Sequence, residues 1–253
     1  MIMVTGMLLE IGIGVPAAAA LVVGYGVRGR SSRLFGPNVW HGPRDQKLIA
    51  LTFDDGPSEW TPHILEILDP LNVHATFFQC GANVARLPQI SRQVVQAGHE
   101  IGNHTYSHPR LITCSAERIR QEIADTQKAL EDATGKNPRL FRAPYGLKWF
   151  GLRPALEEFG LTGVMWTTIC YDWEWEADEI AELVLDKAAN GAILCLHDGD
   201  RVKEKVDRRH TVKALQHFLP RLYERGFRFV PAGTFCPARY AGQSGKEPAS
   251  RLT

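Results

Sequence analysis

The sequence lacks paired cysteines, basic clusters and internal repeats, and each absence excludes a class of protein. Its five cysteines are an odd number and no two are spaced Cys-x-x-Cys, so neither a disulfide framework nor a zinc knuckle is indicated. Net charge is only +1 and no Lys/Arg-rich run interleaves with aromatic residues, so no nucleic-acid partner is expected. No segment repeats at a fixed period. The Gly-x-Ser-x-Gly pattern is also missing, so serine acyl-enzyme chemistry has no support.

Size and composition are ordinary for a soluble globular domain. The chain has 253 residues, of which 44% are hydrophobic and 23% are charged. This is enough for one large α/β barrel or two small domains. A chain of this length buries about three quarters of the surface that its unfolded form exposes, so it needs no disulfide or structural metal for stability.

The N-terminal region contains a long uncharged stretch, Ile11–Val27, which three arginines follow directly. The stretch is at the short end of what spans a bilayer and also resembles the core of a signal peptide. We therefore expect a membrane anchor or export signal, and a protein of the cell envelope. The arginines favour the alternative of a cytoplasmic domain, because positive charge is retained on the cytoplasmic side of a membrane.

Composition also divides the chain. Gly29–Pro43 reads as a linker, and the segment from Tyr240 onward is rich in Gly, Ser, Pro and Lys. We expect a hydrophobic N-terminal segment with its linker over residues 1–35, one folded domain over 36–239, and a flexible tail over 240–253.

Short apolar runs alternate with amphipathic segments along the rest of the chain. The candidate strands are Leu48–Phe53, Val73–Phe78, His99–Asn103, Leu140–Arg142, Gly163–Trp166, Ala192–Leu196 and Phe227–Val230. The candidate helices, in which apolar residues recur at helical spacing, are Pro62–Leu71, Ser115–Thr134, Glu176–Ala189 and Thr211–Arg225. Such alternation is typical of a mostly parallel sheet covered by helices.

Polar residues follow several of these strands. Asp54, His104, Arg142, Asp172 and His197 each fall at or just beyond the carboxyl end of a different strand. In (β/α) barrels this rim is where active sites form. Convergence on one pocket is easier in a closed ring than along an open edge, so a barrel is favoured over an open sheet.

Two of the polar motifs contain metal-ligand chemistry. His104 and His108 are four residues apart, and on a helical turn their imidazoles would lie on one face and bind one ion. Asp54 and Asp55 are adjacent acids after an apolar strand, which is costly if both are buried and charged unless a cation lies beside one of them. Three protein ligands with open positions are typical of catalytic zinc, which lowers the pKa of water to about 7. The second carboxylate could then accept the proton.

The ordered motifs resemble those of the polysaccharide deacetylases, carbohydrate esterase family four. The resemblance covers roughly Leu48 to Phe229 and depends on the segments TFDDGP at Thr52–Pro57, HTYSH at His104–His108, FRAPYG at Phe141–Gly146, YDW at Tyr171–Trp173 and LHDG at Leu196–Gly199. It implies a distorted (β/α)7 barrel with parallel strands and the active site at their C-terminal ends. It also implies one divalent ion, usually Zn²⁺, and removal of N-acetyl groups from N-acetylglucosamine polymers such as peptidoglycan or chitin. Separately, we expect a monomer.

The same resemblance implies roles for particular residues. Asp54 would be the general base, oriented by Arg142. The metal ligands would be Asp55, His104 and His108.

The remaining roles concern the acetyl group and the leaving amine. The backbone N–H of Tyr145 would help form an oxyanion hole, and Tyr145 would also contact substrate. His197 would protonate the leaving amine, with Asp172 supporting its charged form. Leu196 and Trp173 would line the slot for the acetyl methyl.

Two features leave the substrate open. Many family members carry an Asp where this chain has Ile169, which could alter the pocket or the substrate, and the stretch Tyr171–Glu176 could form part of a sugar-binding wall. The alternatives are an O-acetyl-glycan esterase, a hydrolase of small cyclic amides, and a catalytically silent relative that only binds glycans. The His104/His108 pair argues against the cyclic-amide group, whose members tend to lack the metal ligands.

Overall fold

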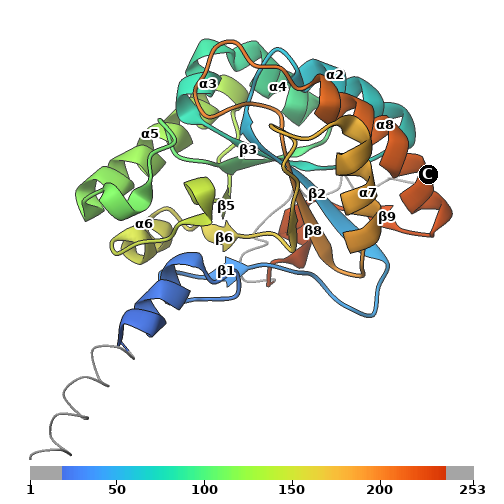
Figure 1. Cartoon of the computed structure of the whole chain (residues 1–253). Coiled ribbons are helices and arrows are strands. Elements are labelled where there is room, and N and C mark those ends of the chain that lie inside the picture. The colour runs from blue at the N-terminus through green and yellow to red at the C-terminus, as the bar shows by residue number, and fades with distance from the viewer. Residues whose placement is uncertain (1–18, 238–253) are drawn as a thin grey trace, which may run out of the picture.

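A computed structural model of the chain describes residues 19–237 (Figure 1). The predicted tail and most of the predicted anchor therefore lie outside the described residues. Residues 19–28 form a helix, and residue 19 is the first residue that the structure describes. Within the described range, no helix is both long enough and apolar enough to cross a bilayer.

The strands form one parallel sheet whose spatial order is β1-β6-β5-β4-β3-β2-β8-β7, with β9 also paired to β2. Their bounds are β1 Asn38–Val39, β2 Leu48–Gly56, β3 Thr76–Gln79, β4 Glu100–Asn103, β5 Leu140–Phe141, β6 Thr162–Val164, β7 Thr168–Ile169, β8 Ala192–His197 and β9 Arg228–Phe229. The sheet curves with helices on its outer side (Figure 1). The edges β1 and β7 are not paired with each other among the described residues. The barrel is therefore open between β1 and β7, and this opening is its distortion. The prediction of a distorted (β/α)7 barrel is confirmed.

All seven predicted strands are present, and two short ones were missed. β1 lies inside the segment predicted as a linker, where it pairs with β6 through Asn38 and Val39. β7 pairs with β8 through Thr168 and Ile169. Two residues are too few to show the alternation that identifies a strand, so the linker interpretation was wrong at β1.

The helices largely follow their predicted segments. The described helices after residues 19–28 are α2 Thr61–Leu68, α3 Gly81–Arg86, α4 Pro88–Gln96, α5 Ala116–Thr134, α6 Leu152–Glu158, α7 Ala177–Lys187 and α8 Arg209–Glu224. Ser115 caps the N-terminus of α5, because its hydroxyl accepts from the backbone N–H of Arg118, and Gly135 in the left-handed conformation caps the C-terminus. The short helices α3, α4 and α6 were missed because they contain only two turns or so of periodic pattern.

Strand alternation decides which side chains of β2 face the barrel interior. Ile49, Leu51 and Phe53 pack in the large cluster that includes the inner faces of α2, α7 and α8. Ala50 packs in the interior cluster instead. Because side chains alternate along a strand, the next residues on the interior face are Thr52 and Asp54. This parity places the Asp54 carboxylate in the barrel mouth.

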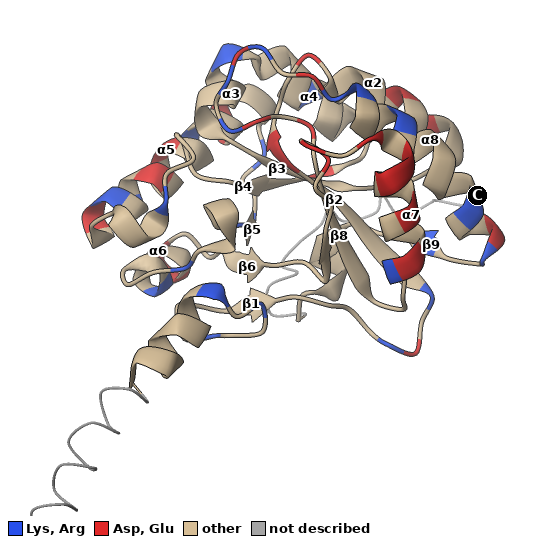
Figure 2. Cartoon of the chain, in the orientation of Figure 1, with Lys and Arg blue, Asp and Glu red and all other residues tan. Residues whose placement is uncertain are grey.

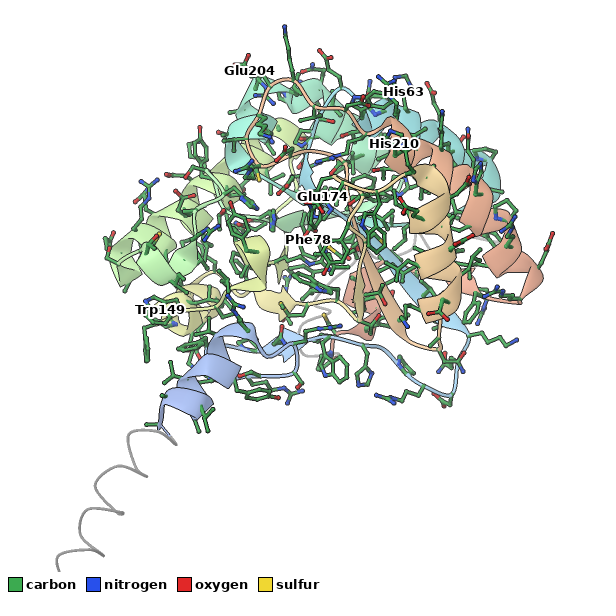
Figure 3. All side chains as sticks on the ribbon, in the orientation of Figure 1. His63, Phe78, Trp149, Glu174, Glu204 and His210 are labelled. Atoms are coloured by element: carbon green, nitrogen blue, oxygen red, sulfur yellow. The ribbon has the colours of Figure 1, made fainter. Side chains whose placement is uncertain are left out.

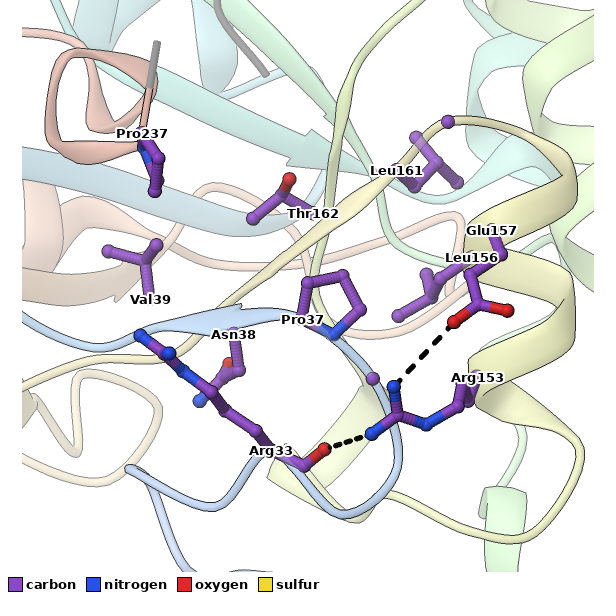
Figure 4. A pocket seen from close by; sticks show the side chains of 12 residues that line it. Arg33, Pro37, Asn38, Val39, Arg153, Leu156, Glu157, Leu161, Thr162 and Pro237 are labelled. Carbon is purple, nitrogen blue, oxygen red and sulfur yellow. Dashed lines mark hydrogen bonds and ion pairs between the residues drawn. The ribbon is translucent and has the colours of Figure 1, made fainter. Parts of the chain in front are cut away.

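The N-terminal segment is fixed to the domain next to α6. Arg153 on α6 donates to the backbone carbonyl of Arg33 at 2.6 Å and pairs with Glu157 at 3.6 Å (Figure 4). These groups border a cavity of about 480 Å³ between β1 and α6. The guanidinium of Arg153 is thus already satisfied by the protein's own acceptors.

Candidate active site

A cavity of about 560 Å³ opens at the carboxyl ends of the strands. Glu174, one of its lining residues, lies over the middle of the sheet in Figure 3. The cavity is lined by Asp54, Asp55, His104, His108, Tyr145, Trp166, Ile169, Trp173, Glu174, His197, Asp200, Arg201, Lys203 and Arg208. It brings together side chains from segments that are far apart in the sequence, at the rim where the sequence predicts the site.

A local irregularity at the end of β2 turns two adjacent carboxylates into the same cavity. The register of β2 against β3 shifts between Asp54 and Gly56, and Asp55 has a left-handed φ of 74°. Consecutive residues of a regular strand face opposite sides, so without this bulge Asp55 would point away from Asp54. Asn83 stabilises the turn, because its amide donates to the backbone carbonyl of Asp55 at 2.8 Å.

Arg142 holds the carboxylate of Asp54. Its Nη1 donates to Asp54 Oδ1 at 2.6 Å and to Thr52 Oγ1 at 2.8 Å. The side chain is fully buried and its guanidinium lies over the ring of Phe78 at 4.1 Å. A planar guanidinium fixed in this way orients the carboxylate and leaves Oδ2 directed into the site.

Asp55 faces two imidazoles. Its Oδ1 lies 3.3 Å from His104 Nε2 and 3.1 Å from His108 Nε2, and the ligand atoms of the three residues lie within 4.8 Å of one another. His104 Nδ1 contacts the carbonyl of Arg142 at 2.8 Å. The carbonyl can only accept, so Nδ1 carries the proton and Nε2 presents its lone pair to the site.

The charge state of these groups suits a cation. Burial alone would raise the pKa of Asp55, but the adjacent imidazoles of His104 and His108 hold that pKa well below the usual range. Burial would lower the pKa of His104, but the charges of Asp54 and Asp55 raise it. A proton and a cation therefore compete for the same imidazole nitrogen. Asp55 Oδ1 has no hydrogen-bond partner among the described residues. A carboxylate and two imidazoles with such a buried, unpaired oxygen fit a divalent ion of the zinc type.

The loop that carries the two histidines corrects one expectation. Thr105 and His108 have φ values of 65° and 56°, so residues 104–108 form a left-handed loop and not a helical turn. Glu122 on α5 stabilises the loop by accepting from the backbone N–H groups of Tyr106 at 2.8 Å and Ser107 at 2.7 Å. The conformation of this loop, and not helical spacing, brings the two imidazoles together.

His197 and Asp172 form a buried pair on the other side of the cavity. Asp172 Oδ1 accepts from His197 Nδ1 at 2.7 Å, and Asp172 Oδ2 accepts from the His197 backbone N–H at 2.8 Å and from Thr211 at 2.9 Å. Burial would lower the pKa of His197, but the charge and hydrogen bond of Asp172 raise it to about 9. The imidazole is therefore a cation at neutral pH, with Nε2 free to face the cavity.

Asp54 and His197 lie face to face. One carboxylate oxygen of Asp54, one ring nitrogen of His197 and the Cys195 sulfur all lie within 4.8 Å of one another. Burial raises the pKa of Cys195 well above its usual value, so the thiol keeps its proton, and it lies 3.4 Å from Asp54 Oδ2, to which it donates. A protonated thiol is a poor ligand, which makes this trio a less suitable metal site than the one at Asp55.

The apolar wall of the cavity differs in part from the prediction. Trp173 lines it, with its ring 4.9 Å from the His197 ring. Leu196 is not a lining residue and is fully buried in the cluster packed against the helices. It precedes His197 on β8, so strand alternation directs it to the opposite face, and its prediction as a slot residue was wrong. Ile169 and Trp166 line the cavity in its place.

Tyr145 lies at the mouth of the cavity with a left-handed φ of 57°. Its ring is half exposed and lies 4.7 Å from the ring of His108. This places the Tyr145 ring next to His108, one of the three candidate ligands.

Several residues near the site were not predicted from the sequence. Asn83 and Glu122 are distant in the chain from the residues they hold. Asp198 is completely buried, accepts from the Thr61 hydroxyl at 2.6 Å, and has its pKa raised to about 7, mainly by burial. Only Asp198, inside the LHDG segment, could have been found from its neighbours.

Histidines outside the motifs lie elsewhere. Figure 3 labels His63 on α2 and His210 on α8, on the outer helices. His99 is buried, its Nδ1 accepts from the backbone N–H of Ala75 at 3.1 Å, and burial lowers its pKa to about 4. None of these three lines the cavity.

Comparison with known proteins gives consistent matches. Residues 41–164 match the family model described as polysaccharide deacetylase. The chain is 38% identical to a peptidoglycan-N-acetylglucosamine deacetylase of Bacillus cereus over 76% of this chain and 89% of that one. It is 38% identical to a chitooligosaccharide deacetylase of Azorhizobium caulinodans over 74% and 94% of the two chains.

A solved structure shares the fold. The crystal structure of a peptidoglycan N-acetylglucosamine deacetylase superposes with a TM-score of 0.74 at 34% identity, covering 78% of this chain and 92% of that one. Solved structures described as belonging to carbohydrate esterase family four include a pseudoenzyme as well.

Proposed function

Because the chain belongs to the polysaccharide deacetylase family, and so to the hydrolases of carbon–nitrogen bonds other than peptide bonds, we propose that it removes the N-acetyl group from N-acetylglucosamine residues of a cell-envelope glycan. Residues 36–239 form the catalytic domain. The observation that carries this proposal is that the two adjacent carboxylates have different partners. Asp54 pairs with Arg142, whereas Asp55 faces two imidazoles.

Asp55, His104 and His108 hold one divalent ion, for which Zn²⁺ suits the mixed nitrogen and oxygen ligands. When bound, such an ion supplies a Lewis acid for the amide carbonyl and lowers the pKa of water. The protein prepares these ligands by fixing the His104 tautomer through the Arg142 carbonyl and by keeping Asp55 ionised.

Asp54 is the general base. Its Oδ1 is held by Arg142, and Oδ2 faces the cavity, where it accepts a proton from the attacking water as the new carbon–oxygen bond forms. Arg142 keeps the carboxylate in one orientation, so little reorganisation is needed when the proton moves. The Tyr145 N–H, at the cavity mouth, donates to the developing oxyanion.

His197 is the general acid. An amine is a poor leaving group until it is protonated, so cleavage of the carbon–nitrogen bond needs a proton at the nitrogen. The Asp172 carboxylate keeps the His197 imidazole charged, and Nε2 donates this proton as the bond breaks. Trp173, Trp166 and Ile169 provide an apolar wall for the acetyl methyl.

The test is release of acetate from N-acetylglucosamine oligomers by the purified chain supplied with Zn²⁺. We expect turnover by the natural chain and a loss of at least about 1,000-fold in Asp54→Asn, with Zn²⁺ binding retained because Asp54 is not a ligand. Full activity of Asp54→Asn would refute the assignment of the base.

Two alternatives have distinct outcomes. An O-acetyl esterase would release acetate from acetylated xylan faster than from the N-acetylated oligomers. A catalytically silent relative would bind the oligomers without turnover across several metals. The complete His197–Asp172 pair favours N-deacetylation, because an alkoxide leaving group depends less on an acid than an amine does.

A further inference from the structure

A second cavity, of about 380 Å³, adjoins the active site and has arginines on its walls. Tyr145 and Trp166 line both cavities, so the two are neighbours. The second cavity is lined by Arg28, Arg30, Arg110, Tyr145, Gly146, Leu147, Met165 and Trp166, and none of these is acidic. In Figure 2, Lys and Arg positions mark the end of the N-terminal helix near α6 and β1, whereas Asp and Glu positions gather near the carboxyl ends of β2 and β8.

The three guanidinium groups lack protein counter-ions in residues 19–237. The ion pairs of arginine in this range involve only Arg118, Arg120, Arg142, Arg153, Arg201 and Arg209. Arg30 donates to the backbone carbonyl of Thr167, and the Arg110 guanidinium lies 5.1 Å from the centre of the Tyr145 ring. In the cavity of Figure 4, by contrast, Arg153 pairs with Glu157.

The segment that carries Arg28 and Arg30 is anchored to the catalytic domain. Lys148 Nζ donates to the carbonyls of Gly29 at 2.7 Å and Ser32 at 3.0 Å, and the Lys148 N–H donates to the carbonyl of Val27 at 3.1 Å. The Lys148 side chain is buried, and burial lowers its pKa to about 8. Lys148 is three residues after Tyr145, so its contacts hold Arg28 and Arg30 at a fixed place beside the mouth of the active site.

From this arrangement we infer that the arginine-lined cavity binds an anionic group, a carboxylate, on the sugar next to the one that is deacetylated. Guanidinium groups recognise carboxylates through paired, charge-assisted hydrogen bonds. The inference builds on the proposed function and narrows its substrate class. The muramic acid residues of peptidoglycan carry a carboxylate that is free wherever the peptide stem has been removed from the glycan strand, whereas chitin oligomers are neutral. The cavity therefore selects the charged glycan.

The experiment compares two substrates that differ only in this charge. One is a tetrasaccharide of alternating N-acetylglucosamine and N-acetylmuramic acid, and the other is the same glycan with each carboxylate converted to its amide. For the full-length protein supplied with Zn²⁺, we expect kcat/KM for acetate release to be at least about tenfold higher on the charged glycan, mainly through a lower KM. The preference shrinks as salt is added, because salt screens the attraction.

The variant Arg28→Gln/Arg30→Gln should bring the ratio of the two kcat/KM values to within about twofold of one. Arg110 lies in a different segment, and Arg110→Gln should also reduce the ratio of the two kcat/KM values toward one. The proposal can therefore be tested even if the double variant does not fold. The matched control is Arg92→Gln, an exposed arginine on α4 that does not line either cavity. It should keep the ratio of the natural chain.

The outcomes separate this inference from the proposed function. If the natural chain deacetylates both glycans equally well, the inference is wrong and the function stands. If neither glycan is deacetylated, the function fails, and calorimetric binding of the charged tetrasaccharide by the natural chain but not by the double variant still supports the cavity. Binding to phosphatidylglycerol vesicles that depends on Arg28 and Arg30, with an unchanged substrate ratio, would assign them to lipid headgroups and overturn the inference.

Discussion

The two sides of the active site are built in different ways. The side with Asp55, His104 and His108 depends on left-handed backbone at Asp55, Thr105 and His108. Asp55 Oδ1 and His108 Nδ1 have no hydrogen-bond partner there among the described residues. The side with Asp172 and His197 has no left-handed residue at either position, and both oxygens of Asp172 accept hydrogen bonds.

This difference indicates what each side requires. The first side has positioned ligands and uncompensated polar atoms, so it is complete only with a cation. The second side satisfies its own polar groups and needs none. Removing one ligand should therefore disable the first side entirely, while the second side should respond to changes in proton affinity.

The largest effect is expected from Asp55→Asn. The amide removes the negative charge that balances the cation, so Zn²⁺ affinity should fall below detection, and kcat/KM for acetate release should fall at least about 1,000-fold. Titration calorimetry with Zn²⁺ and an acetate assay measure both. Retained Zn²⁺ binding with normal turnover in this variant would place the metal elsewhere.

A change on the opposite side should separate turnover from metal binding. His197→Gln removes the acid, so kcat on the N-acetylated oligomer should fall about 100- to 10,000-fold while Zn²⁺ affinity stays the same. Loss on 4-nitrophenyl acetate should be much smaller, because its leaving group departs without a proton. An equal loss on both substrates would contradict the role of His197 as acid.

A smaller effect on the metal side is expected at Glu122. Glu122→Gln replaces the carboxylate that holds the backbone of Tyr106 and Ser107, so the loop should sample other conformations and Zn²⁺ affinity should weaken about 10- to 100-fold. Glu131→Gln, an exposed residue of the same helix, is the control and should leave affinity unchanged. Equal affinities in the two variants would limit Glu122 to a role in helix stability.

Sequence patterns predicted the regular parts of the molecule better than the irregular ones. The long buried runs of β2 and β8 identified the sheet, and the residues at strand ends identified the rim. The alternation of side chains along β2, its strand parity, also accounts for the position of the Asp54 carboxylate in the barrel mouth. The same parity, applied to β8, would have shown that Leu196 faces away from His197 and toward the helices.

The irregular parts depend on contacts that no local pattern encodes. Asp55 enters the cavity only because of a bulge and a left-handed φ, whereas the sequence shows just two acids in a row. Glu122 resembles any charged residue on a helix, and only tertiary packing makes it the acceptor for a distant loop. The choice of Asp55 over Asp54 as the metal ligand was therefore reached by family resemblance alone.

The smallest effect concerns the pH dependence of stability. The pKa of His197 is raised from 6.5 to about 9 in the folded chain by Asp172, against the effect of burial. A pKa raised by folding stabilises the folded state fully below about pH 6.5, and this contribution is lost as pH rises through about 9. The free energy of unfolding from urea titrations should thus fall by on the order of 2 to 3 kcal/mol across this range. In Asp172→Asn the decrease should be smaller, and the same decrease in both proteins would show that another group titrates.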